Sequence, residues 1–272
     1  MSRVLVASDL DRTLIYSARA FWLTTADDEA PSFVVSEIHQ GAPISFMTRE
    51  SERLLSRIIE LGSFVPVTTR TVAQYHRVQL PGGVPEYAVT SNGGTILLNG
   101  KIDDEWGDSL RVRTAAACAP LREIEEILLE KTVAPWILRL HDAEHLFLYA
   151  IVERDLMPSD DLRFLTERCR ALGWLVSVQG RKLYCVPSTI DKKSAVAEVR
   201  RRLGADSSVA LGDSLLDAEM LLDATLAFRP AHGELHDAGF TADTLGVTAS
   251  RGVLAGEELL GLTLDALGRL SA

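Results

Sequence analysis

Cysteine, basic residues and long apolar runs are all scarce in this sequence. Its three cysteines, Cys118, Cys169 and Cys185, are far apart and contain no Cys-x-x-Cys pair, so we expect neither a disulfide framework nor a cysteine-based zinc site. No uninterrupted apolar stretch reaches the length of a membrane-spanning helix, and the first residues lack the apolar core of a signal peptide. These absences lead us to expect a cytoplasmic protein that does not bind a membrane.

Positive charge is also in short supply. The 272 residues include 28 lysines and arginines against 38 acidic residues, which gives a formal net charge of −10. Proteins that bind nucleic acids neutralise the phosphate backbone with lysine and arginine, so we expect no nucleic-acid partner. The length and the apolar fraction of 47% suffice for two domains with buried cores. The oligomeric state is not indicated by these numbers.

The start of the chain carries the clearest chemical signal. Residues 4–7 form an apolar run of strand length, and Asp9, Asp11 and Thr13 follow it. Side chains two residues apart in an extended segment point the same way, so we expect the two carboxylates to lie close together. Such a pair is costly unless a cation or a proton is shared between its members. Mg²⁺ is the expected cation because it prefers oxygen ligands, and a carboxylate can also attack phosphorus as a nucleophile.

Three more polar clusters follow along the chain. A second apolar run ends at Thr68, and Lys192 opens an amphipathic stretch. A third apolar run ends at Gly212 and Asp213, with Asp217 shortly after them. In a parallel α/β sheet, ligands bind just beyond the carboxyl ends of the strands. The sequence therefore predicts that an acid pair, a hydroxyl, a lysine and a second acid pair meet at one edge of one sheet.

This ordered set resembles the motifs of the haloacid dehalogenase superfamily of phosphotransferases. The matching residues are Asp9-Leu10-Asp11-x-Thr13, Thr68, Lys192 and Gly212-Asp213-x-x-x-Asp217. Further segments resemble the subclass with a large α/β cap, which includes the Cof-type, sucrose-phosphate and mannosyl-3-phosphoglycerate phosphatases. These segments are Thr68-x-Arg70, Ser91-Asn92-Gly93 and Asp191-Lys192-x-Ser194-Ala195. The resemblance covers about residues 1–95 and 187–250.

The resemblance implies an α/β fold with a Rossmann-like parallel-sheet core and an inserted α/β cap domain that contains an antiparallel sheet. It places the hydrolase core at residues 1–96 and 187–272 and the cap, which would set substrate specificity, at residues 97–186. Periodicity in the middle of the chain agrees, because it predicts helices at 115–131 and 160–172, each followed by two strands. A flap-like hairpin is predicted within residues 33–47.

The resemblance also implies an activity, the Mg²⁺-dependent hydrolysis of a phosphomonoester through an aspartyl-phosphate. The substrate class that it suggests is a sugar phosphate or a similar small phosphorylated metabolite. Asp9 would be the nucleophile and Asp11 the general acid and base, while Thr68 and Lys192 would stabilise the phosphoryl group. The expected metal ligands are Asp9, Asp11, Asp213 and Asp217. The residues expected to bind substrate are Arg12, Thr13, Thr69, Arg70, Asn92, Gly93, Arg181 and Lys182.

Some positions depart from the pattern of the subclass. Arg12, Thr69 and Lys193 stand where glycine is usual, and Leu216 stands where asparagine is usual. Arg12 could narrow the mouth of the site or add a cationic contact for an anionic substrate. Two alternatives stay open: a phosphotransferase or phosphomutase that passes the phosphate to a second hydroxyl, and a non-catalytic regulatory protein on a degenerate hydrolase fold.

Overall fold

The computed structural model describes residues 3–130, 134–179 and 181–270. It divides the chain into two compact units, Met1–Asp103 with Lys192–Ala272, and Asp104–Asp191. The predicted boundaries at residues 97 and 186 lie a few residues before those of the two units. At the first boundary, the small antiparallel sheet that ends at Ile102 belongs to the first unit. Within the described ranges, no helix combines the length and apolarity that a bilayer crossing requires.

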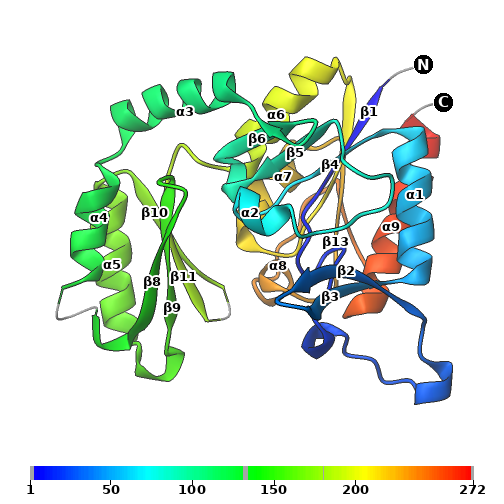
Figure 1. Ribbon diagram of the computed structural model, residues 1–272, viewed down its shortest axis with the longest axis horizontal. Coiled ribbons are helices and arrows are strands. Elements are labelled where there is room, and N and C mark those ends of the chain that lie inside the picture. The colour runs from blue at the N-terminus through cyan, green and yellow to red at the C-terminus, as the bar shows by residue number, and fades with distance from the viewer. Residues whose placement is uncertain (1–2, 131–133, 180, 271–272) are drawn as a thin grey trace. The chain divides into compact units, whose positions relative to one another are not determined.

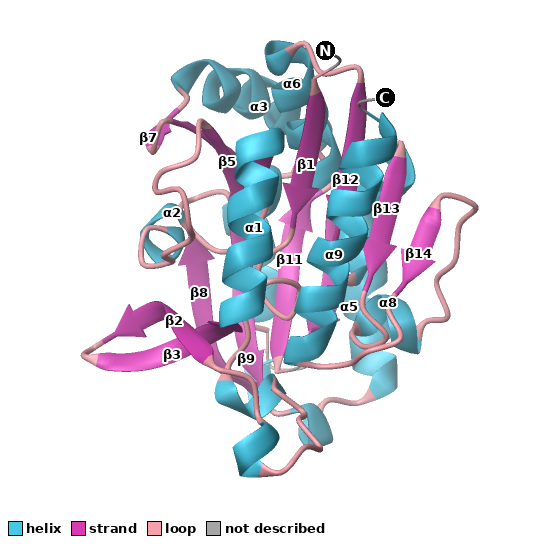
Figure 2. Cartoon of the chain, turned by 90° about the vertical axis from the view of Figure 1, so that its right-hand side faces the viewer, coloured by secondary structure: helices cyan, strands magenta, loops and turns pink. Residues whose placement is uncertain are grey.

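The first unit is built on a five-stranded parallel sheet, which Figure 2 shows nearly face-on. The strands, in their order across the sheet, are β14 (Leu245–Val247), β13 (Leu226–Arg229), β12 (Ser207–Leu211), β1 (Val4–Ser8) and β4 (Ser63–Pro66). All five residues of β1 are buried, as is expected for a strand covered by helices on both faces. This arrangement confirms the predicted parallel core.

Helices cover both faces of this sheet. Helices α1 (Arg49–Leu61) and α9 (Val253–Leu270) pack on one face (Figure 2), and α6 (Lys192–Leu203) and α7 (Ala218–Asp223) on the other (Figure 1). Helix α1 begins at Arg49 because the Thr48 hydroxyl accepts a hydrogen bond from the Ser51 backbone nitrogen. Its side chains Leu55 and Ile58 are fully buried in the core.

Shorter elements complete the first unit. The predicted hairpin is present as β2 (Phe33–His39) and β3 (Ala42–Thr48), with a β-bulge at Glu37. A second antiparallel sheet joins β5 (Tyr87–Thr90), β6 (Thr95–Leu98) and β7 (Lys101–Ile102). The unit also contains the short α-helices α2 (Val72–Tyr75) and α8 (Glu234–Asp237).

The second unit contains the predicted antiparallel sheet. Its strands, in their order across the sheet, are β10 (Trp174–Gln179), β11 (Lys182–Pro187), β9 (Phe147–Val152) and β8 (Ile137–Ala143). Helices α4 (Leu121–Leu128) and α5 (Ser159–Ala171) pack on one face of it (Figure 1). Their apolar side chains form a separate core with those of β9 and β11. The unit therefore has its own hydrophobic interior.

The predicted helix at 115–131 is wrong in its bounds. The structure has α3 (Asp104–Ala117) and then α4, with Pro120 as the residue that precedes α4. Proline has no backbone N–H and disfavours helical geometry in the residue before it, so one helix cannot run through this position. Lys131, the predicted end, lies outside the described residues, as does Gly180 in the predicted turn between β10 and β11.

Candidate active site

The strand ends of the first unit bring the predicted clusters to one edge of its sheet. Strands β1 and β12 pair in parallel register, and the Asp9 backbone nitrogen donates to the Leu211 carbonyl at 2.9 Å. On the other side of β1, the Val67 nitrogen donates to the Ser8 carbonyl at 2.7 Å. Because the strands end together, Asp9 lies between the segment that follows β4 and the segment that follows β12.

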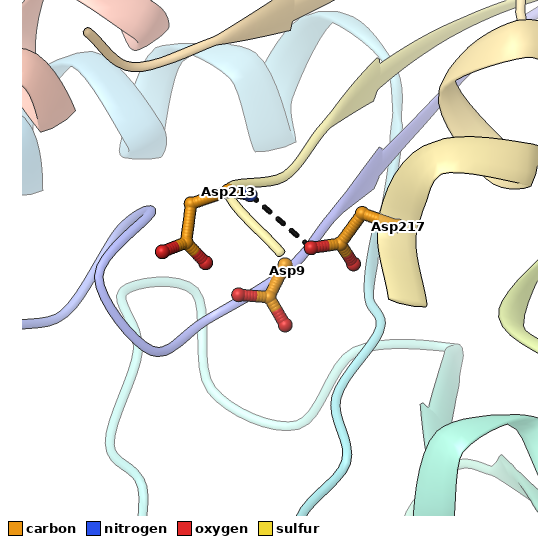
Figure 3. A group of neighbouring side chains, drawn as sticks. All are labelled: Asp9, Asp213 and Asp217. Carbon is orange, nitrogen blue, oxygen red and sulfur yellow. Dashed lines mark hydrogen bonds between the residues drawn. The ribbon is translucent and has the colours of Figure 1, made fainter. Parts of the chain in front are cut away.

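Three carboxylates converge at this edge (Figure 3). Asp9, Asp213 and Asp217 are buried, and each offers an oxygen that lies within 4.8 Å of those of the other two. Asp9 follows β1, and Asp213 and Asp217 follow β12. Such a concentration of buried negative charge is stable only when cations or protons balance it.

Lys192 supplies one positive charge to this cluster. It lies at the first residue of α6, its side chain is 1% exposed, and its Nζ donates to Asp9 Oδ1 and Asp217 Oδ1, at 2.6 Å each. Burial alone would lower the pKa of Lys192, but the charges of Asp217 and Asp9 outweigh it and hold that pKa above its usual value. The ammonium group is therefore charged at neutral pH and fixes two of the three carboxylates.

Asp217 also shapes the loop that carries Asp213. Its Oδ2 accepts hydrogen bonds from the Asp213 nitrogen at 3.1 Å, the Ser214 nitrogen at 2.9 Å and the Ser214 hydroxyl at 2.8 Å. Gly212 permits this contact, because a Cβ on it would lie 2.5 Å from the Cβ of Asp217. The Asp217 carboxylate is thus committed to protein donors, and it holds the loop in place.

Asp9 and Asp213 accept fewer hydrogen bonds than Asp217 does, and Asp9 Oδ1 accepts one from Lys192. Asp9 Oδ2 accepts a hydrogen bond from the Thr13 hydroxyl at 3.2 Å. No donor in the described part of the chain lies within hydrogen-bond distance of the Asp213 carboxylate, and Arg12 Nε is 3.8 Å from its Oδ2. Burial, with the charges of Asp217 and Asp11, raises the pKa of Asp9 to about 7 although Lys192 opposes the rise. Burial and the two other carboxylates also raise the pKa of Asp213 well above its usual range.

These observations fit a hard divalent cation. The set consists of carboxylate oxygens alone. It carries three acidic groups against one buried lysine and the half-exposed Arg12, and the Asp213 carboxylate accepts no hydrogen bond from the described residues. Burial is the main cause of the two raised pKa values, and repulsion between the carboxylates adds to it. Oxygen ligands of this kind suit Mg²⁺, whose charge would favour the ionised carboxylates.

Asp11, which is not one of the three clustered carboxylates, forms an ion pair with an arginine. Arg70 donates to both Asp11 oxygens, from Nε and from one terminal nitrogen, at 2.7 Å each. The other terminal nitrogen of Arg70 donates to Glu37 at 2.7 Å. Glu37 also accepts hydrogen bonds from Arg77 at 2.9 Å and from the Ser45 hydroxyl at 3.1 Å. Burial would raise the pKa of Glu37, but these hydrogen bonds outweigh it and keep the pKa below its usual value.

Glu37 is a residue that the sequence did not point to. It lies in β2, and its side chain is fully buried between Arg70 and Arg77. The β-bulge at this position breaks the alternation of the strand and turns the carboxylate inward. A lone glutamate in an apolar strand is a weak signal of this role, since its partners come from a different part of the chain.

The other predicted residues divide between the two units. Thr68 is buried after β4, and its hydroxyl accepts a hydrogen bond from the Arg70 nitrogen at 3.2 Å. Thr69 follows it, and Asn92 and Gly93 form the turn after β5, where the Asn92 nitrogen donates to the Thr68 carbonyl at 2.9 Å. Arg181 and Lys182 belong to the second unit, at the start of β11.

Comparison with known proteins identifies the structural class. No protein-family model and no curated protein matches this chain. Solved structures do match it over nearly its whole length, and they include haloacid dehalogenase-like hydrolases, so the chain has the fold of that class. The resemblance predicted from the motifs is thereby confirmed at the level of fold.

Among the matching structures is the sucrose-phosphatase of Synechocystis sp. in complex with sucrose and phosphate. It has a TM-score of 0.68 at 16% identity, and the match covers 98% of this chain and 99% of that one. A trehalose-6-phosphate phosphatase related protein has a TM-score of 0.56 at 18% identity, over 98% and 100% of the two chains. A haloacid dehalogenase-like hydrolase from Bacillus subtilis has a TM-score of 0.53 at 15% identity, over 98% and 94%.

Proposed function

We propose that this chain is a Mg²⁺-dependent phosphomonoester hydrolase that works through an aspartyl-phosphate. The observation that carries the proposal is the buried Asp9 carboxylate, which Lys192 and Thr13 orient beside Asp213. The fold shared with the sucrose-phosphatase supports it. A small phosphorylated metabolite, such as a sugar phosphate, is the proposed substrate.

In the first step, an Asp9 oxygen attacks phosphorus and the bond from phosphorus to the alcohol oxygen breaks. The alcohol takes a proton from Asp11 as it leaves. In the second step, water attacks the aspartyl-phosphate and gives its proton to Asp11, which releases inorganic phosphate and restores Asp9. Lys192 and the Thr68 hydroxyl stabilise the phosphoryl oxygens, since phosphoryl transfer depends mainly on positioning and charge.

The metal ligands in this proposal are Asp9, Asp213 and the Asp11 backbone carbonyl. Asp217 acts on them indirectly, because its oxygens already accept hydrogen bonds from Lys192 and the Asp213 loop. When bound, Mg²⁺ neutralises phosphate charge so that an anionic nucleophile can approach.

The ion pair between Arg70 and Asp11 affects when Asp11 can donate a proton. Two charge-assisted hydrogen bonds stabilise the carboxylate form of Asp11, which is the form that accepts a proton from water. Donation to the leaving alcohol requires the protonated form, so one of these hydrogen bonds has to be exchanged during the first step.

Release of inorganic phosphate tests the proposal directly. The purified protein with excess Mg²⁺ is expected to hydrolyse p-nitrophenyl phosphate and members of a panel of phosphorylated metabolites. Excess chelator is expected to lower the rate by at least about a hundredfold, and added Mg²⁺ to restore it. Loss of ester without an equal release of phosphate would favour a phosphotransferase or phosphomutase, and no turnover of any phosphate ester would favour a regulatory protein.

Asp11→Asn should separate the two chemical steps. We expect a burst of about one p-nitrophenol per enzyme, because this leaving group needs little protonation, followed by turnover roughly 10²–10⁴-fold slower than that of the wild type. Alkyl phosphates, whose leaving groups need the proton, should lose the first step as well. Rapid-mixing kinetics with both substrate types measures this difference. Equal losses on both substrates and in both steps would exclude an acid–base role for Asp11.

The second unit is the proposed source of substrate specificity, as the predicted cap at residues 97–186. In β9, Leu148 and Ala150 pack in the core with α4 and α5, so Tyr149 between them points to the opposite face of the sheet. On that face, the His141 ring stacks on Tyr149 with centroids 4.7 Å apart, and Lys182 Nζ lies 5.6 Å from the Tyr149 ring centroid. An aromatic and cationic surface of this kind suits a polar phosphorylated metabolite.

Substitutions at the start of β11 test this assignment. Arg181→Ala and Lys182→Ala should lower kcat/KM for the best metabolite in the panel by about tenfold, and that for p-nitrophenyl phosphate far less. Arg163→Ala, which removes an exposed arginine of the same unit that pairs with Asp160, is the matched control. If the ratio of metabolite to aryl phosphate turnover is unchanged in both variants, this part of β11 does not set specificity.

A further inference from the structure

An exposed tryptophan lies beside the carboxylate cluster, in contact with two arginines. The guanidinium carbon of Arg12 is 5.2 Å from the Trp22 ring centroid, and that of Arg251 is 5.8 Å from it. Trp22 is 45% exposed, which is unusual for so large an apolar side chain. Arg12 also links this group to the site, since its Nε is 3.8 Å from Asp213 Oδ2. We call Arg12, Trp22 and Arg251 the Trp22 platform.

A buried histidine, His232, contacts both Arg12 and Trp22. His232 Nδ1 accepts a hydrogen bond from the Gly252 nitrogen at 3.1 Å, so its Nε2 donates to the Arg12 carbonyl at 2.8 Å. Burial, with the positive charges of Arg12 and Arg251, lowers the pKa of His232 to about 4, so the ring is neutral. Its ring meets Trp22 edge to face, with centroids 5.1 Å apart. The same imidazole therefore supports the Arg12 backbone and the Trp22 ring.

The backbone is strained to present these side chains. Arg12 has a φ of 63° and Trp22 a φ of 47°, in the left-handed region that favours glycine and is unusual for bulky side chains. Gly252 makes room for the tryptophan segment, because a Cβ on it would lie 2.0 Å from the Phe21 carbonyl oxygen. Strain of this kind persists where the surroundings hold it, and it is concentrated at binding and catalytic sites.

The charge of the platform is not fully balanced by the protein. Arg12 is 43% exposed in its side chain, and its carboxylate neighbour, Asp213, belongs to the proposed metal site. Arg251 is exposed, and no carboxylate of the described residues lies within ion-pairing distance of it. Two guanidinium groups that flank an aromatic ring offer several N–H donors and a positive field to a ligand. The chemical group that complements them is an anion.

We propose that the Trp22 platform binds a second anionic group, a carboxylate or a phosphate, on the substrate of the proposed phosphatase. The inference rests on the proposed function, because it states which chemical group the leaving alcohol of the same substrate carries. In this arrangement the ester phosphate is bound at Asp9 and Lys192, and the second anion contacts Arg12 and Arg251 while its carbon skeleton lies against Trp22. The preferred substrates are therefore phosphomonoesters with an additional acidic group.

Matched substrate pairs test this preference. Glycerol 3-phosphate and 3-phosphoglycerate differ by a carboxylate, and fructose 6-phosphate and fructose 1,6-bisphosphate differ by a phosphate. We expect the wild type to show a kcat/KM about tenfold higher for the acidic member of at least one pair, and the pair that responds identifies the acid. Arg251→Gln and Arg12→Gln should reduce this preference to about twofold or less. Arg49→Gln, which removes an exposed arginine at the start of α1, is the control and should keep it.

Binding measurements separate this inference from the proposed function. Calorimetric titration of Asp9→Asn, with and without Arg251→Gln, compares the same pairs without turnover. If Asp9→Asn binds the acidic member roughly tenfold more tightly and Arg251→Gln removes this difference, anion binding by the Trp22 platform is supported, even if no ester is hydrolysed. Absence of a preference in the wild type and in the titration, or a preference that both arginine variants retain, would mean that the arginines only stack on Trp22, and would overturn the inference. Failure of all hydrolysis would overturn the proposed function alone.

Discussion

Asp9→Asn is expected to lower the turnover of p-nitrophenyl phosphate by roughly 10⁴-fold or more while the fold stays intact. The substitution keeps the shape of the side chain and an oxygen for Lys192, but it removes the negative charge that attacks phosphorus. Steady-state kinetics with excess Mg²⁺ measures the loss, and circular dichroism checks the fold. Asp265→Asn, on the exposed side of α9, is the matched control and should leave turnover unchanged.

The same variant should change how stability depends on pH. Because the pKa of Asp9 in the folded protein is about 7, above its usual value, the folded state holds the proton more tightly than the unfolded chain. The stability that this provides is present at low pH and is lost as the pH rises through 7. In chelator, Asp9→Asn should therefore gain stability relative to the wild type between pH 5 and pH 8.

Residual turnover of Asp9→Asn above about one hundredth of that of the wild type would exclude Asp9 as the nucleophile.

Lys192→Met should be the most destabilising of the proposed substitutions. Methionine has a similar length, but it leaves Asp9 and Asp217 buried beside Asp213 without their cation. Removal of one partner of a buried ion pair typically costs about 3–5 kcal/mol, and we expect a loss of this order in the free energy of unfolding at pH 8. Turnover should also fall by several orders of magnitude, because Lys192 orients the nucleophile.

The pH dependence of Lys192→Met gives a second check. In the variant, the carboxylates can bind protons at pH 5, so the destabilisation should shrink as the pH falls from 8 to 5. In the wild type, the pKa of Lys192 lies above its usual value, so the stability that the ammonium group provides is complete below about pH 10. Urea denaturation at both pH values measures the difference. Lys193→Met removes a half-exposed lysine that pairs with Glu219, and this neighbouring control should change stability by less than about 1 kcal/mol. If Lys192→Met lost less than about 1 kcal/mol as well, its ion pairs with Asp9 and Asp217 would not be a main source of stability at the cluster.

The parts of the site that follow strand ends could be predicted from the sequence. Asp9, Asp213 and Thr68 are placed by a general rule, since parallel strands end at one edge and their following residues meet there. Lys192 could be placed only through the resemblance, because a lysine at a helix start is most often a surface residue. The break at Pro120 could have been predicted as well, from the missing N–H of proline.

The residues that the sequence did not point to depend on packing between distant segments. Glu37 is directed inward by a β-bulge, and its arginine partners come from the segment after β4. Trp22 contacts Arg251 only because Gly252 lets the two segments approach closely. Neither a bulge nor a left-handed backbone at a tryptophan follows from residue periodicity, so these contacts could be found only in three dimensions.

The pairing of Arg70 with both Asp11 and Glu37 has a consequence for how related chains are recognised. A comparison of the four sequence motifs includes Asp11 but not Glu37, which lies in a hairpin that carries none of them. Yet Glu37 accepts a hydrogen bond from Arg70, the residue that pairs with Asp11. A related chain could keep all four motifs and lack the glutamate. In that chain, the arginine equivalent to Arg70 would still pair with the aspartate but would lose its ion pair with Glu37.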